Sequence, residues 1–308
     1  MGTKLVPMEF GKLPSVDGVD FTLPHDDPAT ARVLARSENA GPPRIAMGTA
    51  AWGDASFVGS LYPPGTKQRE YLHHYSRQFG AIELNTTFYG LRVDSLRKWA
   101  ESAPRSFRFC PKFPGSITHE RRLRRVEALT DEFFTALDVL GERLGLPWMV
   151  LPPQVGPDSL GDLRSFVQRT APLRRFAVEL RHPAWFSDVT ARAAVGELFE
   201  EHGISWILTD VAGRRDVLHC RLTSPTVVLR FVGNSHHPSD WRRLEAWTER
   251  LTGWCRSGVE QLYLFLHQPV EELNIAVADR IGPSLGEALN VSVQVPQRVE
   301  APRQDSLF

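Results

Sequence analysis

The chain has 308 residues, 42% of them hydrophobic, which is enough to bury one large core as a single domain. Its 36 basic and 36 acidic side chains cancel at neutral pH, which excludes the broad positive field of a non-specific nucleic-acid binder. Its three cysteines, Cys110, Cys220 and Cys255, are far apart and lack CxxC spacing, which excludes a disulfide framework and a zinc ribbon.

The amino-terminal region is not expected to contain a signal peptide. It lacks the basic and hydrophobic segments of a signal peptide, and no apolar run in the chain reaches the length of a membrane span. We therefore expect a soluble cytoplasmic protein with reduced thiols and no membrane partner. Residues 1–43 are rich in Pro, Gly and Asp and show no sustained periodicity, which predicts an irregular arm over the folded body.

From residue 44 onward, short apolar runs alternate with stretches of helical period. Amphipathic spacing predicts helices over 126–144 and 241–254, whereas 211–225 shows only weak helical period. Eight strands alternating with helices predict a (β/α)8 TIM barrel, an α/β fold, with an open doubly wound sheet as the alternative. The predicted strands are 44–48, 81–85, 107–112, 148–151, 176–180, 205–210, 226–231 and 262–267.

The carboxyl-terminal region lies outside this alternation. Residues 290–308 are polar and interrupted by proline, which predicts a mobile tail. The sequence therefore predicts one barrel domain over 44–289, preceded by the arm and followed by the tail.

Charged side chains share one face of several predicted strands. In the stretch FAVELRHPAW (176–185), Glu179 and Arg181 alternate with large apolar residues, and Glu83 and Lys112 do the same in their strands. Because the apolar face must pack on helices, the charged face points into the barrel, near the carboxyl ends where TIM-barrel active sites form. The residues expected at this rim are Trp52, Glu83, Asn85, Tyr89, Lys112, His119, Gln154, Glu179, Arg181, His182, Trp185, Asp210, Arg230, His267 and Gln268.

These ionisable groups allow two interpretations. Buried charges cost several kcal/mol each unless they are paired, so the set implies either salt bridges that only close the barrel or a charged ligand. We favour the ligand, because functional sites gather ionisable groups in one cleft. A basic cluster at 119–127 is interpreted either as a phosphate contact near the mouth or as a solvated helix face.

Five ordered segments carry a resemblance: GTAAWGD, AIELNTTFYG, FRFCPKFPGSITH, LPPQ and VELRHPAWF. In order and spacing they are similar to those of the YecE-like family, also catalogued as domain of unknown function seventy-two. The resemblance covers about residues 44–285 and implies a TIM barrel of unassigned activity. Many members carry paired asparagines after the last strand, whereas this chain has LHQPVEE, which leaves the role of His267 and Gln268 open. The family's motif positions match Glu83, Asn85, Tyr89, Lys112, His119, Glu179, Arg181, His182 and Trp185.

The first predicted function is an enzyme acting on an anionic small molecule or phosphoester. Lys112, Arg181 and Arg230 are expected to hold a phosphate or carboxylate. The acid–base groups are expected among Glu83, Glu179, His119 and His182, assisted by Lys112. The other rim residues are expected to line the substrate site, with Trp52, Tyr89 and Trp185 as flat walls.

A divalent metal gives a second version of the enzyme, ranked below the metal-free one. Glu83, Glu179, His182 and Asp210, joined by His267, are the oxygen and imidazole ligands found in metal-dependent isomerases and apurinic-site nucleases. The lower rank follows from the lysine and two arginines, which already supply positive charge at the same rim.

The last five residues, QDSLF, suggest a different class of function. They fit the peptide pattern that docks on the bacterial sliding clamp, with Gln304, Leu307 and Phe308 as the contacting residues, although a five-residue match also arises by coincidence. A clamp-binding tail would favour a nucleic-acid repair substrate over a metabolite. A third interpretation is a barrel that binds its ligand without turning it over.

Overall fold

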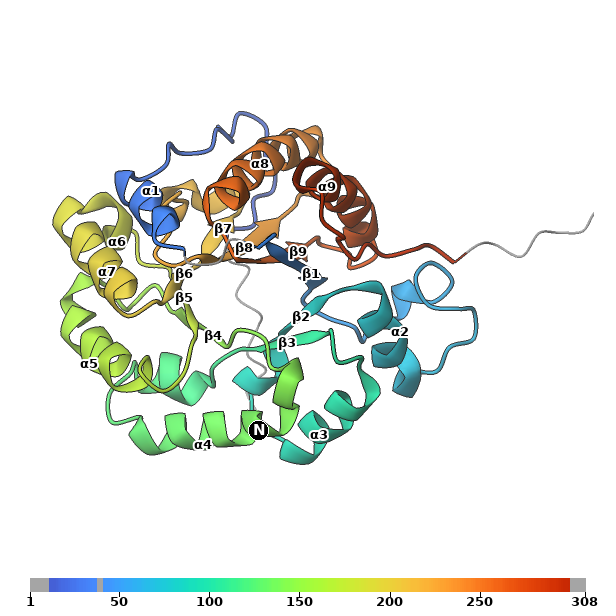
Figure 1. Cartoon of the computed structure of the whole chain (residues 1–308), viewed down its shortest axis with the longest axis horizontal. Coiled ribbons are helices and arrows are strands. Elements are labelled where there is room, and N and C mark those ends of the chain that lie inside the picture. The colour runs from blue at the N-terminus through green and yellow to red at the C-terminus, as the bar shows by residue number, and fades with distance from the viewer. Residues whose placement is uncertain (1–10, 38–40, 300–308) are drawn as a thin grey trace, which may run out of the picture.

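The computed structural model describes residues 11–37 and 41–299. Its strands lie at the centre, and the helices lie around them (Figure 1). Every predicted apolar run contains a strand, and the run 205–210 is divided at Ile207. The strands are β1 (Arg44–Thr49), β2 (Ala81–Leu84), β3 (Arg108–Pro111), β4 (Trp148–Leu151), β5 (Ala177–Leu180), β6 (Ser205–Trp206), β7 (Leu208–Asp210), β8 (Thr226–Val232) and β9 (Gln261–His267).

All strand pairs are parallel. One sheet has the order β3-β2-β1-β9-β8-β7 and the other the order β4-β5-β6. Between the sheets, Lys112 and Trp148 form an isolated parallel bridge, and β6 runs into β7 through Ile207, whose N–H donates to the carbonyl of Val178 at 2.9 Å. The predicted α/β fold with parallel strands is thereby confirmed.

The two faces of the strands carry different side chains. The outer face is rich in large aliphatic and aromatic residues that pack against the helices. The inner face begins with a smaller cluster, and nearer the carboxyl ends the same face carries charged residues. Alternation along each strand produces this separation, as the sequence pattern predicted. The inner cluster comprises Ala46, Ala81, Cys110, Trp148, Val150, Ala177, Ile207, Val228, Tyr263 and Phe265.

The helices follow the amphipathic segments with one difference. Helix α4 ends at Leu137, short of the predicted residue 144, and continues as a 3-10 turn in which Gly141 has φ 53°. A left-handed residue of this kind breaks the α-helical hydrogen-bond pattern, and glycine adopts it at no steric cost. The helices are α1 (Pro28–Ala35), α2 (Tyr71–Gln78), α3 (Val93–Ser102), α4 (Glu127–Leu137), α5 (Leu160–Thr170), α6 (Ala184–Ser187), α7 (Val189–Glu201), α8 (Pro238–Ser257) and α9 (Leu273–Leu289).

The amino-terminal arm contains a helix, α1 (Pro28–Ala35), which the prediction of an irregular arm missed. Asp27 caps it, since its carboxylate accepts from the N–H of Ala29, and Pro28 opens it. Between β7 and β8 the chain forms only a 3-10 turn over Ala212–Val217, and α1 lies between α7 and α8 there (Figure 1). The arm thus covers strands that lack a crossover helix of their own.

A buried hydroxyl helps to hold α1 in this place. The Oγ1 of Thr30 donates to the carbonyl of Cys220 and accepts from the N–H of Leu222, both at 3.0 Å. The N–H of Leu222 would otherwise be buried without a partner in this segment, whereas the carbonyl of Cys220 also accepts from the N–H of Asp27 at 3.0 Å. The contacts together fix the position of α1 along this segment.

The expected tail also begins differently from its prediction. Val293 and Val295 pack against the core, and the N–H of Val299 donates to the carbonyl of Ser60 at 2.8 Å. Residues 291–299 therefore lie along the body. Across residues 11–37 and 41–299, no helix combines the length and apolar character needed to cross a bilayer.

Candidate functional site

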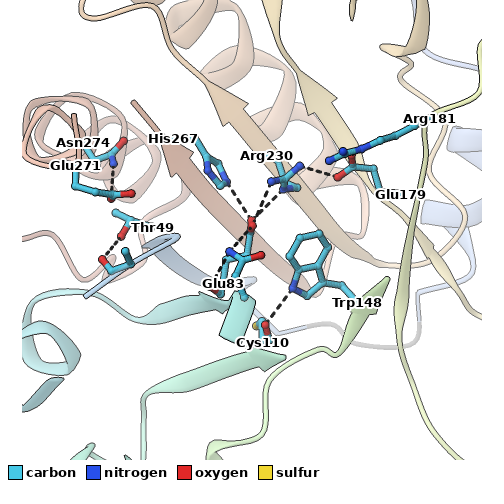
Figure 2. Close-up of polar contacts among 12 residues, drawn as sticks. Thr49, Glu83, Cys110, Trp148, Glu179, Arg181, Arg230, His267, Glu271 and Asn274 are labelled. Carbon is cyan, nitrogen blue, oxygen red and sulfur yellow. Dashed lines mark hydrogen bonds and ion pairs between the residues drawn. The ribbon is translucent and has the colours of Figure 1, made fainter. Parts of the chain in front are cut away.

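Glu83 is the centre of a buried charge network at the carboxyl ends of the strands (Figure 2). Its Oε2 accepts from Arg230 Nε at 2.9 Å and lies 3.0 Å from His267 Nε2, while its Oε1 accepts from Arg230 Nη2 at 3.2 Å and from Asn85 Nδ2 at 3.1 Å. Only 1% of Glu83 is exposed. Although burial favours the neutral acid, Arg230 and His267 hold the pKa of Glu83 well below its usual range.

Arg230 carries the network on to Glu179. Its Nη1 donates to Glu179 Oε2 at 2.7 Å, and Arg181 Nε donates to Glu179 Oε1 at 2.6 Å. Against the effect of burial, Arg181 and Arg230 lower the pKa of Glu179 to about 2. Burial also opposes the charge of Arg230, but Glu179 and Glu83 raise the pKa of its guanidinium. We call His267, Glu83, Arg230, Glu179 and Arg181 the charge network; it joins β9, β2, β8 and β5.

Lys112 stands beside the network but outside its ion pairs. Its Nζ lies 4.7 Å from the ring centroid of Phe88 and 5.0 Å from that of Trp148. Among residues 11–37 and 41–299, no carboxylate comes within 4.0 Å of this nitrogen and no acceptor forms a hydrogen bond with it. Burial, reinforced by Arg230, lowers the pKa of Lys112 to about 8.

His119 lies on a π-helical turn that follows β3. Its Nδ1 is 2.8 Å from Thr118 Oγ1, and its ring meets Phe88 edge-on at 4.9 Å between centroids. Burial, then the charges of Lys112 and Arg181, lower the pKa of His119 to about 4. The imidazole is therefore neutral at pH 7 and able to accept a proton. Short π-helical turns of this kind often occur at functional sites.

His182 borders the same rim in the loop after β5. Its Nδ1 accepts from the N–H of Ala184 at 3.1 Å, so the neutral ring carries its proton on Nε2. The ring packs on Gly156, where an added Cβ would lie 3.1 Å from it. Gln154, in the same loop as Gly156, is exposed.

Two residues predicted for the rim are structural instead. Asp210 faces outward, where its carboxylate accepts from Arg243 Nη1 at 3.1 Å, from Trp247 Nε1 at 2.7 Å and from Arg215. Trp185 is fully buried and donates from Nε1 to the carbonyl of Val155 at 2.9 Å. Asp210 therefore stabilises the packing of α8, and Trp185 does not form a wall of the site.

Two further predicted residues support loops. Gln268 accepts from the N–H of Ser235 at 2.9 Å and donates to Asp240 at 3.3 Å, which holds the loop after β8. Trp52 packs edge-on against Trp99 at 5.1 Å between centroids, on the outer side of the strands.

Tyr89 keeps the exposure that a substrate wall requires. It is 77% exposed and lies 5.2 Å from Phe88 between ring centroids, in the loop after β2. Because Phe88 also contacts Lys112 and His119, Tyr89 borders the part of the rim that these two residues occupy.

A cavity of about 680 Å³ reaches the network from one side. It lies between residues 11–17 of the arm and the loops that follow β8 and β9. His267 lines this cavity and also contacts Glu83, so it connects the cavity with the buried carboxylate.

Sequence reasoning missed Glu271 and Trp148. Burial, helped by nearby acidic groups, raises the pKa of Glu271 to about 7, and its Oε2 accepts from Asn274 Nδ2 at 3.0 Å (Figure 2). The sequence contained a signal for Glu271, because it is the first acidic residue after the last predicted strand, in LHQPVEE. Trp148 opens a strand in an apolar run, so nothing in its local pattern distinguished it from an ordinary core residue.

The metal candidates are not gathered in one place. Within the described part of the chain, no three His, Cys, Asp or Glu side chains are placed to hold a metal ion. Glu83 and Glu179 have their oxygens engaged by arginines, His182 lies in the loop after β5, and Asp210 faces outward. Gln304, Leu307 and Phe308, which were expected to bind the sliding clamp, lie outside the described residues, so clamp binding stays a prediction.

The fold and site define an α/β protein of parallel strands whose inner face ends in a buried arginine–glutamate network. Residues 46–302 match the family described as "Protein of unknown function DUF72", and the chain belongs to that family. The resemblance seen in the sequence is therefore confirmed.

Relatives agree with this placement. The chain is 30% identical over 257 residues to UPF0759 protein YecE of Escherichia coli strain K12, covering 77% of this chain and 92% of that protein. It is 28% identical over 152 residues to UPF0759 protein YunF of Bacillus subtilis strain 168, covering 46% and 52%. A crystal structure of a DUF72 family protein from Enterococcus faecalis V583 superimposes with a TM-score of 0.59 at 15% identity, covering 81% and 99%, which shows a shared fold.

Proposed function

We propose that this protein is an enzyme that uses acid–base chemistry on an anionic substrate, phosphorylated or carboxylated, bound at the carboxyl ends of the strands. The observation that carries the proposal is the surplus charge of Lys112. Glu83 and Glu179 are matched by Arg230 and Arg181, which leaves the ammonium unmatched among the described residues. An unmatched, largely buried charge is costly, and a bound anion removes that cost.

The groups suited to proton transfer are Lys112, His119 and Glu271. Their pKa values of about 8, about 4 and about 7 make a lysine that readily loses its proton, a neutral imidazole and a carboxyl group that titrates near neutrality. Glu83 and Glu179, which the sequence nominated as acid–base groups, instead hold the arginines in place, because their lowered pKa values make them weak bases.

We infer that the two sheets close into a (β/α)8 barrel around this site. The Lys112–Trp148 bridge supports closure on one side, together with the bond from the N–H of Phe113 to the carbonyl of Trp148 at 2.8 Å. On the other side, β6 and β7 belong to one continuous stretch of chain that contributes to both sheets. Closure would bring the ends of all strands to one rim, the usual site of catalysis in such barrels.

Calorimetric titration with inorganic phosphate and with pyruvate tests anion binding. We expect at least one of them to bind the wild-type protein, and Lys112→Met to weaken that binding about tenfold or more. Lys98→Met is the matched control, because Lys98 is an exposed lysine on α3. Equal binding by both variants would contradict the proposal. A turnover screen over phosphorylated and carboxylated metabolites then separates an enzyme from a binding protein.

A further inference from the structure

We propose that Lys112 is a nucleophilic lysine that forms a Schiff base with the carbonyl group of an anionic aldehyde or ketone substrate. This inference rests on the proposed function and names the class of substrate for the same site. It requires an amine that can lose its proton, a contact with solvent or substrate, and surroundings that tolerate a positive iminium ion.

The surroundings of Nζ meet the first requirement. Two aromatic rings lie beside the ammonium, and Arg230 stands nearby as a second cation, its Cζ also 5.0 Å from the Trp148 ring centroid. Desolvation and a neighbouring cation are the two means by which proteins activate a lysine amine. With a pKa of about 8, about a tenth of Lys112 is free amine at pH 7.

The carboxylates that could have kept Lys112 protonated are engaged elsewhere. Both oxygens of Glu83 accept from Arg230, and the two oxygens of Glu179 accept from Arg181 and Arg230. The charge network therefore stabilises itself without Lys112. The side chain of Lys112 is largely but not fully buried, so part of it is in contact with solvent.

The choice of lysine at this position is itself informative. Of the 36 basic residues, five are lysines: Lys4, Lys12, Lys67, Lys98 and Lys112. The described lysines apart from Lys112 are exposed, and the other inward cations at the rim are arginines. Arginine serves ion pairing better and stays protonated, whereas only lysine offers an amine that titrates. The site thus keeps a lysine where the rest of the chain favours arginine.

The proposed step balances without an added oxidant or reductant. The free amine of Lys112 attacks the carbonyl carbon and forms a C–N bond, giving a carbinolamine. The former carbonyl oxygen then takes up protons and leaves as water, while the nitrogen keeps one proton as an iminium ion. Overall, one ammonium and one carbonyl give one iminium and one water. The rings of Phe88 and Trp148 face the new cation, which favours it by a cation–π interaction.

Reductive trapping tests this step. The full-length protein is incubated with pyruvate, glyoxylate or dihydroxyacetone phosphate in the presence of sodium cyanoborohydride, which adds hydride to the iminium carbon and makes the adduct permanent. Peptide mass spectrometry then locates the adducts. We expect one adduct per chain at Lys112, formed at least tenfold faster than any at Lys98, with a rate that reaches half its maximum near pH 8.

Two variants complete the design. Lys112→Arg keeps the positive charge but has no nucleophilic amine, so it should give no adduct there, whereas Lys98→Arg should react like the wild type. If adducts form at Lys112 no faster than at Lys98, the Schiff-base inference is overturned. If phosphate or pyruvate still binds in a Lys112-dependent way in that case, the proposed function stands alone; if neither binds nor reacts, both fail.

Discussion

Lys112 and Trp148 are paired through both backbone and side chain. They are partners in the parallel bridge between the two sheets, and the Nζ of Lys112 lies 5.0 Å from the centroid of the Trp148 indole. The backbone pairing fixes the height of the lysine at the rim, and an aromatic ring rather than a carboxylate faces its ammonium. Burial and the nearby Arg230 outweigh the attraction of this ring for a cation, so the surroundings of the lysine disfavour its charged form.

Lys112→Met should stabilise the protein while removing the proposed anion binding. The lowered pKa of Lys112 means that the folded state disfavours its ammonium, so this cost is present below pH 8 and disappears as the pH rises from about 8 to 10.5. Methionine removes the cost. We expect the free energy of unfolding at pH 7, measured in urea, to rise by about 1–3 kcal/mol. A loss of stability would show that Lys112 is a structural residue; Lys98→Met should change little.

Arg230→Met should destabilise the protein strongly. It would leave Glu83 without its main cation and Glu179 with only Arg181, and breaking a buried ion pair in this way costs about 3–5 kcal/mol. Urea unfolding at pH 7 measures the loss. The exposed pair of Arg97 and Asp94 gives the control, because its removal should cost less than about 1 kcal/mol.

The same network predicts how acid affects the wild-type protein. Because the folded pKa of Glu179 is about 2 and its ordinary value is 4.5, its ionised form contributes stability above pH 4.5 that is lost as the pH falls toward 2. Arg230→Met should make the free energy of unfolding depend less on pH in this range, because Glu83 and Glu179 take up protons at higher pH in the variant. Unfolding curves at pH 5, 4 and 3 test this, and parallel losses in the two proteins would contradict it.

Glu271 should have the opposite dependence on pH. Its folded pKa of about 7 lies above the ordinary 4.5, so the stability it contributes is full below pH 4.5 and is lost as the pH rises to 7. Glu271→Gln should remove that loss and raise the free energy of unfolding at pH 7.5 by on the order of 1–3 kcal/mol. Unfolding between pH 4.5 and 7.5 measures it. An unchanged slope in the variant would show that Glu271 titrates normally.

Thr30→Val should loosen the docking of α1. Valine has nearly the shape of threonine but leaves the N–H of Leu222 without its partner, at about 1–3 kcal/mol for a buried group left unpaired. The carbonyl of Cys220 loses one donor and keeps the N–H of Asp27. Thr30→Ser keeps the hydroxyl and should recover most of the stability in thermal or urea unfolding. Equal destabilisation by valine and serine would assign the effect to packing instead.

Much of the strand pattern could be predicted from the sequence, because alternation is a local property. Glu83, Lys112 and Glu179 were placed on the inner face by parity alone, and the structure puts them there. Asp210 was misplaced because its position late in a strand was considered without its parity. It shares a face with Trp206 and Leu208, which belong to the outer core.

Other features depend on contacts between distant segments, which local patterns do not encode. The Asp27–Pro28 capping signal of α1 was visible, but eight residues are too few to show a sustained period. The isolation of Lys112 could not be predicted either. It arises because Arg230 donates to both carboxylate oxygens of Glu83. Arg230 follows Lys112 by 118 positions and follows Glu83 by 147 positions in the chain.

The docking of α1 has a consequence during synthesis on the ribosome. Thr30 and Cys220 are 190 positions apart in the chain, so α1 is made long before the segment that it covers. At about 5–20 residues per second, the helix waits roughly 10–40 s for its docking surface to be translated. Until then its apolar face has no native partner, and a nascent chain stalled before residue 220 would present that face to chaperones.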